Sequence, residues 1–243
     1  ERDNNGYLSW GSDPYTYRNN SNSKQAAMWE SGLDNSPLFD SANFNRTKNT
    51  LELASVGLLS LYISDCQYLA HMAEILERFE EQNELNTRAA KYSEKLKTLW
   101  DDESGIYRDK DLVTGNFSKR LSPTSFYPLL TGIPTMKQAR RMIDEHFMNP
   151  NEFYGEYMLP SISRNDSAFK DNSYWRGRIW DPMNFLVYLG LKNYDLPEAR
   201  KILANKSLDL IMNEWKDEHR IYENYNATTG EGNDVLNSDS FYS

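Results

Sequence analysis

From about residue 49 onward, apolar residues recur at steps of three and four positions, which is the period of an amphipathic helix. The first stretch with this period has an apolar face made of Leu58, Tyr62, Cys66, Leu69, Met72, Leu76 and Phe79. The apolar face of the second stretch is made of Ala89, Tyr92, Leu96 and Leu99. Asn83 or Asn86 is placed to cap the second helix, and Gly105 is placed to end it. The pattern therefore predicts two long helices in succession.

Helical patterns continue in the second half of the chain. Residues 122–134 predict a short helix that contains prolines, and residues 135–147 have the apolar face of an amphipathic helix. Asp181-Pro182 combines a capping residue with a proline in the first turn, which is typical of a helix start. The last long helix is predicted over residues 196–215.

Loops and short extended pieces are predicted between these helices. Residues 1–48 are rich in Asn, Ser, Asp and Gly, and they predict a loop with one ordered insertion at 24–32. Extended segments are predicted at 105–109, 154–166 and 219–226, and a turn at 229–234.

Paired helices with loops at one end are typical of an α/α toroid or a helical solenoid. We predict an all-α fold, an (α/α)6 toroid of paired helices with short β pieces in its loops. The pattern gives about seven helices, whereas six hairpins need about twelve. Because no linker divides the chain, residues 1–243 are expected to form one partial toroid domain that lacks N-terminal and C-terminal segments.

The composition argues against several classes of partner and cofactor. The 243 residues carry a net charge of -9, which disfavours nucleic acid and anionic membrane surfaces. No apolar run approaches the ~20 residues of a membrane span, and no signal peptide is visible. Cys66 is the one cysteine, so no internal disulfide is possible. His71, His146 and His219 lack metal-site spacing, so no metal is predicted, and His71 is expected to be a packed or surface residue.

Three clusters of aromatic and polar residues fall in the predicted loops, at residues 29–37, 174–184 and 221–232. Each contains carboxylates beside aromatic rings and a glycine. Glycoside hydrolysis needs one carboxylic acid that protonates the leaving oxygen and one carboxylate that activates water or attacks the sugar. Aromatic rings pack against the apolar faces of sugars. The clusters therefore indicate a carbohydrate substrate, although aromatic residues also fill cores.

The motifs in these clusters resemble those of glycoside hydrolase family 63, and more distantly those of the family 37 trehalases. W-E-S-G-L-D-N-S-P, residues 29–37, resembles the segment that carries the general acid. I-Y-E-N-Y-N, residues 221–226, resembles the segment that carries the general base. Y-W-R-G-R-I-W, residues 174–180, resembles the motif that lines the sugar pocket. The sequence is most similar to the prokaryotic branch that includes mannosylglycerate and glucosylglycerate hydrolases.

The resemblance implies a catalytic domain that inverts the anomeric centre of an α-glucoside or α-mannoside, without a metal or organic cofactor. Asp34 would be the general acid and Glu223 the general base, whereas spacing alone does not choose between Glu223 and Glu231. The expected substrate-binding residues are Trp29, Glu30, Tyr174, Trp175, Arg176, Gly177 and Trp180. Arg176 would bond to sugar hydroxyls or hold a carboxylate.

Several positions qualify this expectation. Asp34 must stay protonated near neutral pH, which requires burial or a like charge, and Glu30 is placed to supply that charge. Arg178 stands where relatives often have proline, and an additional cation there would favour an anionic aglycone unless the side chain points outward. No match is found to the family's N-terminal aromatic-W-D segment.

Three alternatives stay open at this stage. One is a trehalase-like hydrolase, and another is a carbohydrate-binding remnant without turnover. A third is a helical scaffold for a protein partner, which predicts that the three clusters lie on different faces. The sequence leaves the oligomeric state open, and the resemblance makes the bacterial cytoplasm or periplasm the expected compartment.

Overall fold

The computed structural model describes residues 2–12 and 23–239, and its main elements are helices. The α-helices are α1 (Lys24–Glu30), α2 (Val56–Ile75), α3 (Phe79–Lys97), α4 (Met136–Arg141), α5 (Asp181–Leu191) and α6 (Pro197–Glu218). The other helical segments are the 3-10 helices η1 (Pro37–Phe39), η2 (Pro123–Thr131) and η4 (Ser167–Asp171), and the π-helical η3 (Met142–Phe147). The predicted helices at 122–134, 135–147 and 196–215 are thus confirmed.

The strands of the described residues are short and pair antiparallel in four two-stranded ribbons. These are β1 (Arg2–Asn4) with β2 (Tyr7–Ser9), β3 (Phe44–Asn45) with β4 (Thr50–Leu51), β5 (Leu53–Ala54) with β8 (Lys110–Asp111), and β6 (Trp100–Asp101) with β7 (Ile106–Tyr107). The fold is therefore helical with small β pieces between helices, as the sequence predicted.

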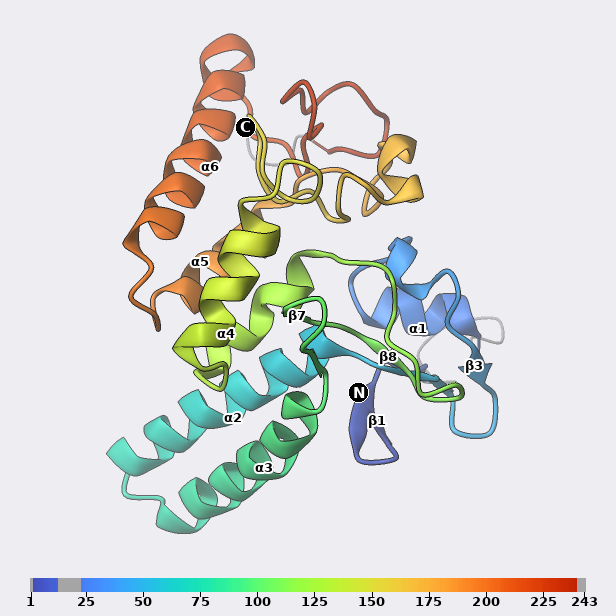
Figure 1. The fold of residues 1–243 in the computed structure, drawn as a ribbon, viewed down its shortest axis with the longest axis vertical. Coiled ribbons are helices and arrows are strands. Elements are labelled where there is room, and N and C mark those ends of the chain that lie inside the picture. The colour runs from blue at the N-terminus through green and yellow to red at the C-terminus, as the bar shows by residue number, and fades with distance from the viewer. Residues whose placement is uncertain (1, 13–22, 240–243) are drawn as a thin grey trace.

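Helices α2 and α3 form an antiparallel hairpin (Figure 1), and η2 and α5 pack beside α2. The start of α2 is fixed by Ser55, whose side chain accepts a hydrogen bond from Leu58 N at 3.2 Å. Phe126 in η2 lies in the core with its ring edge-on to Phe147 and Phe153, at centroid distances of 5.9 and 5.2 Å. Helix α5 packs on η2 and on α6, so the loops before α5 and after α6 adjoin the same packed helices.

Some predicted boundaries were wrong. Helix α3 begins at Phe79, with Arg78 in the capping position, and neither Asn83 nor Asn86 caps it. The chain reverses at Glu77, whose φ is 57°, so the helix starts earlier than a polar cap would suggest. Gly105 lies in the turn between β6 and β7 rather than at the end of α3.

Two predicted extended segments contain no strand in the structure. Residues 154–166 and 219–226 form loops joined by isolated bridges of Ile179 with Pro160 and with Tyr225. The cap prediction at α5 was also wrong, because Trp180 holds the capping position and Asp181 is the first helical residue. The backbone of Ile179 therefore connects both loops in place of a regular sheet.

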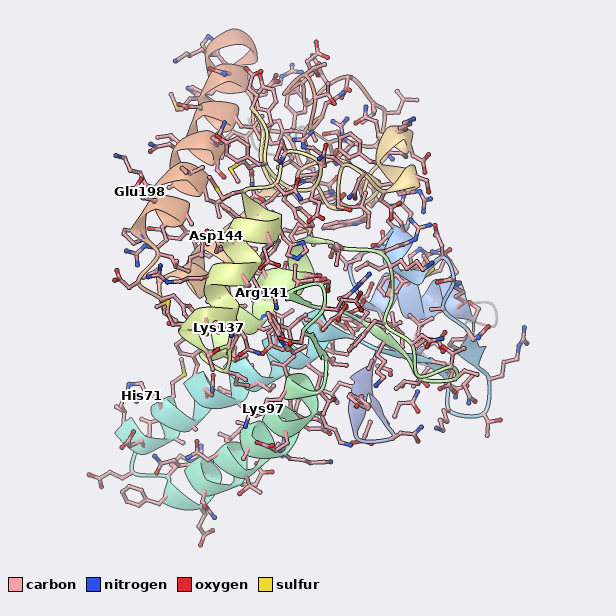
Figure 2. The ribbon with its side chains drawn as sticks, viewed as in Figure 1. His71, Lys97, Lys137, Arg141, Asp144 and Glu198 are labelled. Atoms are coloured by element: carbon pink, nitrogen blue, oxygen red, sulfur yellow. The ribbon has the colours of Figure 1, made fainter. Side chains whose placement is uncertain are left out.

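The remaining surface features are consistent with the sequence patterns. His71 lies on the exposed face of α2 with Nδ1 3.4 Å from Glu74 (Figure 2), so it is a surface residue. Figure 2 also places Lys97 and Glu198 on helices α3 and α6, away from the loops that carry the three clusters in sequence. Over the described ranges, none of the helices has the length and apolar character needed to cross a membrane.

Candidate active site

Asp34 lies in a tight turn between α1 and η1. Ser31 Oγ donates to Met28 O at 2.5 Å and accepts from Leu33 N at 3.0 Å, which fixes the turn after the helix. Gln25 Nε2 donates to the backbone oxygen of Asp34 at 3.1 Å. The local sequence thus holds the Asp34 backbone on both sides while its side chain stays partly exposed.

Asn35 joins the Asp34 turn to the Y-W-R-G loop, 138 residues away along the chain. Its amide Nδ2 donates to Ser173 O at 3.2 Å, and its Oδ1 accepts from Trp175 N at 2.9 Å. These two bonds satisfy backbone groups of the loop, in which Ser173 O also accepts from Arg176 N at 3.0 Å. It brings the first two clusters together.

Arg176 holds carboxylates. Its guanidinium bonds to both oxygens of Asp40, with the shortest distance 3.0 Å, and to Asp171 Oδ2 at 2.7 Å. It also donates to Asn35 O at 3.3 Å. Of the two roles expected for Arg176, carboxylate binding is the one these contacts display.

Gly177 is required by the backbone of the same loop. Its φ is +101°, and a Cβ at this position would lie 2.4 Å from the carbonyl oxygen of Phe169. Its N–H donates to Ser161 Oγ at 3.1 Å. Gly177 therefore shapes the loop that carries Tyr174 and Trp175.

The aromatic side chains of the motif pack on one another. Trp175 and Trp180 are stacked, with ring centroids 3.6 Å apart and an interplanar angle of 8°, and Tyr174 lies edge-on to Trp180 at 4.9 Å. Trp180 Nε1 donates to Tyr174 O at 2.9 Å. Trp175 Nε1 is buried and has no hydrogen-bond partner among the described residues.

Tyr174 connects the second cluster to the third. Its hydroxyl donates to Glu223 Oε1 at 3.4 Å. The backbone N–H of Glu223 donates to Asp239 O at 2.9 Å. Glu231, the other carboxylate that spacing allowed, is exposed on a turn and accepts from Thr229 Oγ1 at 3.0 Å. Glu223 is therefore the carboxylate of this segment that meets the aromatic cluster.

Burial dominates the electrostatics of both candidate catalytic groups. It raises the pKa of the Asp34 carboxyl above its ordinary value. Burial also raises the pKa of Glu223, Asp239 adds to this, the Tyr174 hydrogen bond opposes it, and Asp34 makes a minor addition. Burial together with the charges of Glu223 and Asp34 raises the pKa of Tyr174 to about 12. Tyr174 thus lies within electrostatic reach of both carboxylates.

The remaining expected residues lie elsewhere in the cluster or at its edge. Trp29 and Glu30 are exposed in the last turn of α1, and the Trp29 side chain is 49% exposed. Arg178 is fully buried, with its guanidinium inside the loop 224–234. The guanidinium therefore neither points outward nor faces an open pocket. Arg178 thus gives no reason to expect an anionic aglycone.

A cavity of about 200 Å³ lies beside the Asp34 turn. Its lining is mainly apolar and includes Ser31, Leu33, Trp175 and Met183. Asp34 and Glu223 do not line this cavity, so it adjoins the catalytic candidates through Leu33 and Trp175. Within the residues that the structure describes, no group of three or more metal-binding side chains comes together.

The acidic partners in the site were not found from the sequence. Asp40, Asp171 and Asp239 each contact a motif residue, yet each lies outside the recognised motifs. Asp40 is 136 residues from Arg176, so no local spacing signals the pair.

Comparison with known proteins places these motifs in a family. A family model described as the mannosylglycerate hydrolase MGH1-like glycoside hydrolase domain matches residues 16–242. Mannosylglycerate hydrolase MGH1 from Selaginella moellendorffii is 30% identical over 159 residues, which cover 63% of this chain and 30% of that protein. The match includes most of the chain described above.

Solved structures share the fold. The GH63 mannosylglycerate hydrolase from Thermus thermophilus, in complex with glucose, has a TM-score of 0.70 and 24% identity, and the match covers 84% of this chain and 56% of that one. Neutral trehalase Nth1 from Saccharomyces cerevisiae has a TM-score of 0.68 and 23% identity, over 86% of this chain and 39% of that one.

The fold is accordingly that of part of an α/α toroid. The chain spans less than two thirds of the length of each of these relatives. Because the family model matches nearly the whole sequence, the chain belongs to the mannosylglycerate hydrolase MGH1-like glycoside hydrolase domain family.

Proposed function

We propose that the protein is an inverting glycoside hydrolase that cleaves an α-mannoside or α-glucoside. The observation that carries this proposal is the convergence of three motifs. Asn35 bonds to the loop of Trp175, and Tyr174 in that loop bonds to Glu223. A scaffold for a protein partner would have left these clusters on different faces.

In the proposed reaction, Asp34 donates its proton to the glycosidic oxygen as the bond from that oxygen to the anomeric carbon breaks. Glu223 accepts a proton from a water molecule that attacks the anomeric carbon from the opposite face. The products are a sugar of inverted configuration and the free alcohol. The raised pKa of Asp34 supports its role, because a general acid must be protonated at the working pH.

The aromatic cluster supplies the sugar-binding part of the proposal. Trp175 is held by its stack on Trp180, which fixes the ring at low cost in conformational freedom. Trp175 also lines the mainly apolar cavity beside the Asp34 turn, where an aromatic ring can pack against the apolar face of a sugar. Arg176 and Gly177 act in this proposal as supports of the loop, since their contacts are made within the protein. Trp29 and Glu30 stay candidates at the exposed edge.

The substrate class rests on the relatives. Those of known name include mannosylglycerate hydrolases, so a mannoside or glucoside of a small acceptor is the first candidate. The fold shared with neutral trehalase supports trehalose as the second candidate. Turnover of α-mannosylglycerate, α-glucosylglycerate and trehalose, measured as released sugar, separates these candidates.

Two substitutions test the catalytic assignment. Asp34→Asn and Glu223→Gln each remove one proton-transfer group at nearly constant shape, and turnover is expected to fall at least ~100-fold. Glu231→Gln is the matched control, because Glu231 is an exposed carboxylate eight residues from Glu223 in the same segment. Its turnover is expected to stay within about twofold of the wild type.

The turnover of these variants and of the wild type also tests the non-catalytic alternative. A folded Asp34→Asn or Glu223→Gln protein with near-normal turnover would contradict the role of that residue. A wild-type protein that binds these sugars without hydrolysing them would be the carbohydrate-binding remnant instead.

A further inference from the structure

Arg178 is the largest side chain among those that the structure buries completely. Its backbone oxygen accepts from Ser161 N at 2.8 Å, one residue before the bridge of Ile179 with Tyr225. From this position the side chain enters the loop 224–234, which follows the candidate base directly. Burying a guanidinium costs free energy unless its charge is paired and each of its donors has an acceptor.

The donors of Arg178 are distributed over that loop. Nε donates to Asn224 Oδ1, and Nη1 donates to Asp234 Oδ1 at 2.7 Å and to Asn172 Oδ1 at 3.2 Å. Nη2 donates to the backbone oxygen of Asn224 at 3.3 Å and to that of Glu231 at 3.2 Å. Through these hydrogen bonds, one side chain connects both ends of the loop 224–234 to the backbone that leads into α5.

Asp234 supplies the countercharge in this cluster. Its second oxygen accepts from Asn226 Nδ2 at 2.6 Å and from Asn172 Nδ2 at 3.1 Å. The Asp234 carboxylate is thus bonded on both oxygens, and the loop closes around the ion pair. A lysine at position 178 would keep the charge but lose the planar fork of donors that reaches several acceptors at once.

Asn224 connects this hydrogen-bonded cluster to the candidate base, because it directly follows Glu223 in the chain. The backbone oxygen of Asn224 also accepts from Ser238 Oγ at 2.7 Å, and the side-chain Nδ2 of Asn224 donates to Asn237 O at 3.0 Å. With the bond of Glu223 N to Asp239 O, the backbone on both sides of the base is held. The contacts of the Arg178 guanidinium reach Asn224 rather than the Glu223 side chain, so its effect on Glu223 passes through Asn224.

We infer that Arg178, paired with Asp234, is a positioning residue that holds Glu223 at the angle required for proton abstraction from water. This inference rests on the proposed function. A displacement of about 1 Å in a catalytic group can cost ~100-fold in rate, so the loop around the base needs such support. The arginine that departs from the motif's usual proline thereby has a defined task in this chain.

The test compares three variants with a control. Arg178→Lys keeps the charge, Arg178→Met removes it, and Asp234→Asn removes the countercharge. Arg108→Met is the control, since Arg108 also pairs with an aspartate, Asp101, at 3.0 Å but contacts no site residue. For each folded protein, kcat, KM and the pH dependence of kcat are measured on the best α-mannoside or α-glucoside of the wild type.

Positioning predicts a loss in kcat of ~100-fold for Arg178→Met and ~10-fold or more for Arg178→Lys and Asp234→Asn, with KM within about threefold. The groups that face Glu223 are Tyr174, Asp239 and Asp34. A loosened loop exposes Glu223 to water, so the acidic limb of the pH profile moves to lower pH. Arg108→Met is expected to keep the wild-type kcat and profile.

Hydrogen exchange gives a readout that does not depend on activity. The amides of Glu223 and Tyr225 are expected to exchange faster in Arg178→Lys than in the wild type. Unchanged exchange at these amides, or unchanged kcat and pH profile in folded variants, overturns the inference. If only the Arg178 variants behave normally while Glu223→Gln is inactive, the proposed function stands; a wild type without turnover overturns both.

Discussion

Tyr174 is a residue whose pKa is raised by both the candidate acid and the candidate base. Its hydroxyl bonds to Glu223, and burial together with the charges of Glu223 and Asp34 raises its pKa. Its ring lies edge-on to Trp175 and Trp180. One side chain therefore joins the aromatic wall to the acid–base chemistry.

Removal of the Tyr174 hydroxyl is expected to change the pH profile. Burial raises the pKa of Glu223 and the hydrogen bond from Tyr174 lowers it, so Tyr174→Phe should raise that pKa further. Glu223 then becomes protonated at higher pH, and the acidic limb of the kcat profile moves upward. The profile of Tyr174→Phe, set beside that of Tyr222→Phe, checks this, and a shift to lower pH would contradict the assignment.

Gly177 offers a test of the loop backbone at the same scale. Gly177→Ala combines a left-handed φ with a contact of 2.4 Å to Phe169 O, and it is expected to lower the free energy of unfolding by roughly 2–4 kcal/mol. Gly115→Ala is the matched control, because Gly115 has φ +75° and nothing within 4 Å of the added Cβ.

The difference between these two variants isolates the collision from the backbone strain. Denaturant unfolding of both proteins measures it. Equal losses of unfolding free energy would show that the contact with Phe169 O is relieved at little cost.

At the scale of elements, the sequence predicted the helices well because their apolar faces have a clear period. The predicted face of α3 is buried at Ala89, Tyr92 and Leu96. The end of the face predicted for the first long helix is not, because Leu69, Met72 and Leu76 are 41%, 55% and 67% exposed. The segments 154–166 and 219–226 were predicted as extended, but they pair through Ile179 only at single bridges. Local propensity does not show whether a segment will pair with a distant segment as a full strand or through a single residue.

For the site, too, the local sequence indicated the motifs but not the contacts between distant segments. The motif residues were identified from local sequence, since their order along the chain is itself the signal. The contacts that fix them, such as Arg176 with Asp40, join residues 136 positions apart. Arg178 illustrates the limit most clearly, because its burial depends on the loop 224–234 closing over it.

The start of helix α2 contacts an ionisable group that links stability to pH. Asp109 Oδ1 accepts from Val56 N at 2.8 Å, and burial raises the pKa of Asp109 to about 6. Its folded pKa exceeds the ordinary value of 3.8, so the folded state binds this proton more tightly. The stabilisation from protonation is present at low pH and is lost as pH rises through about 6.

Asp109→Asn is therefore expected to gain stability relative to the wild type as pH rises from about 4 to 7. The gain is at most about 3 kcal/mol, since one pKa unit corresponds to about 1.4 kcal/mol. The free energy of unfolding of both proteins across this range measures the difference. A constant difference with pH would mean that the Asp109 carboxyl titrates normally in the folded protein.

At the scale of the whole molecule, one end of a helical support holds the loops of the site. Figure 1 shows the segment before α5 and the segment after α6 side by side, and the bridge of Ile179 with Tyr225 joins them. The Asp34 turn reaches the same place through Asn35. Segments from the first and last thirds of the chain thus meet, which is how a toroid assembles one site from several helix pairs.

The configuration of the first product tests the central proposal most directly. The wild-type protein is given an α-mannoside or α-glucoside that it hydrolyses, and proton NMR follows the anomeric signal before mutarotation. Inversion through Asp34 and Glu223 predicts that the β anomer appears first and the α anomer later. An α anomer that appears first would mean retention, and it would contradict the roles proposed for these two carboxylates.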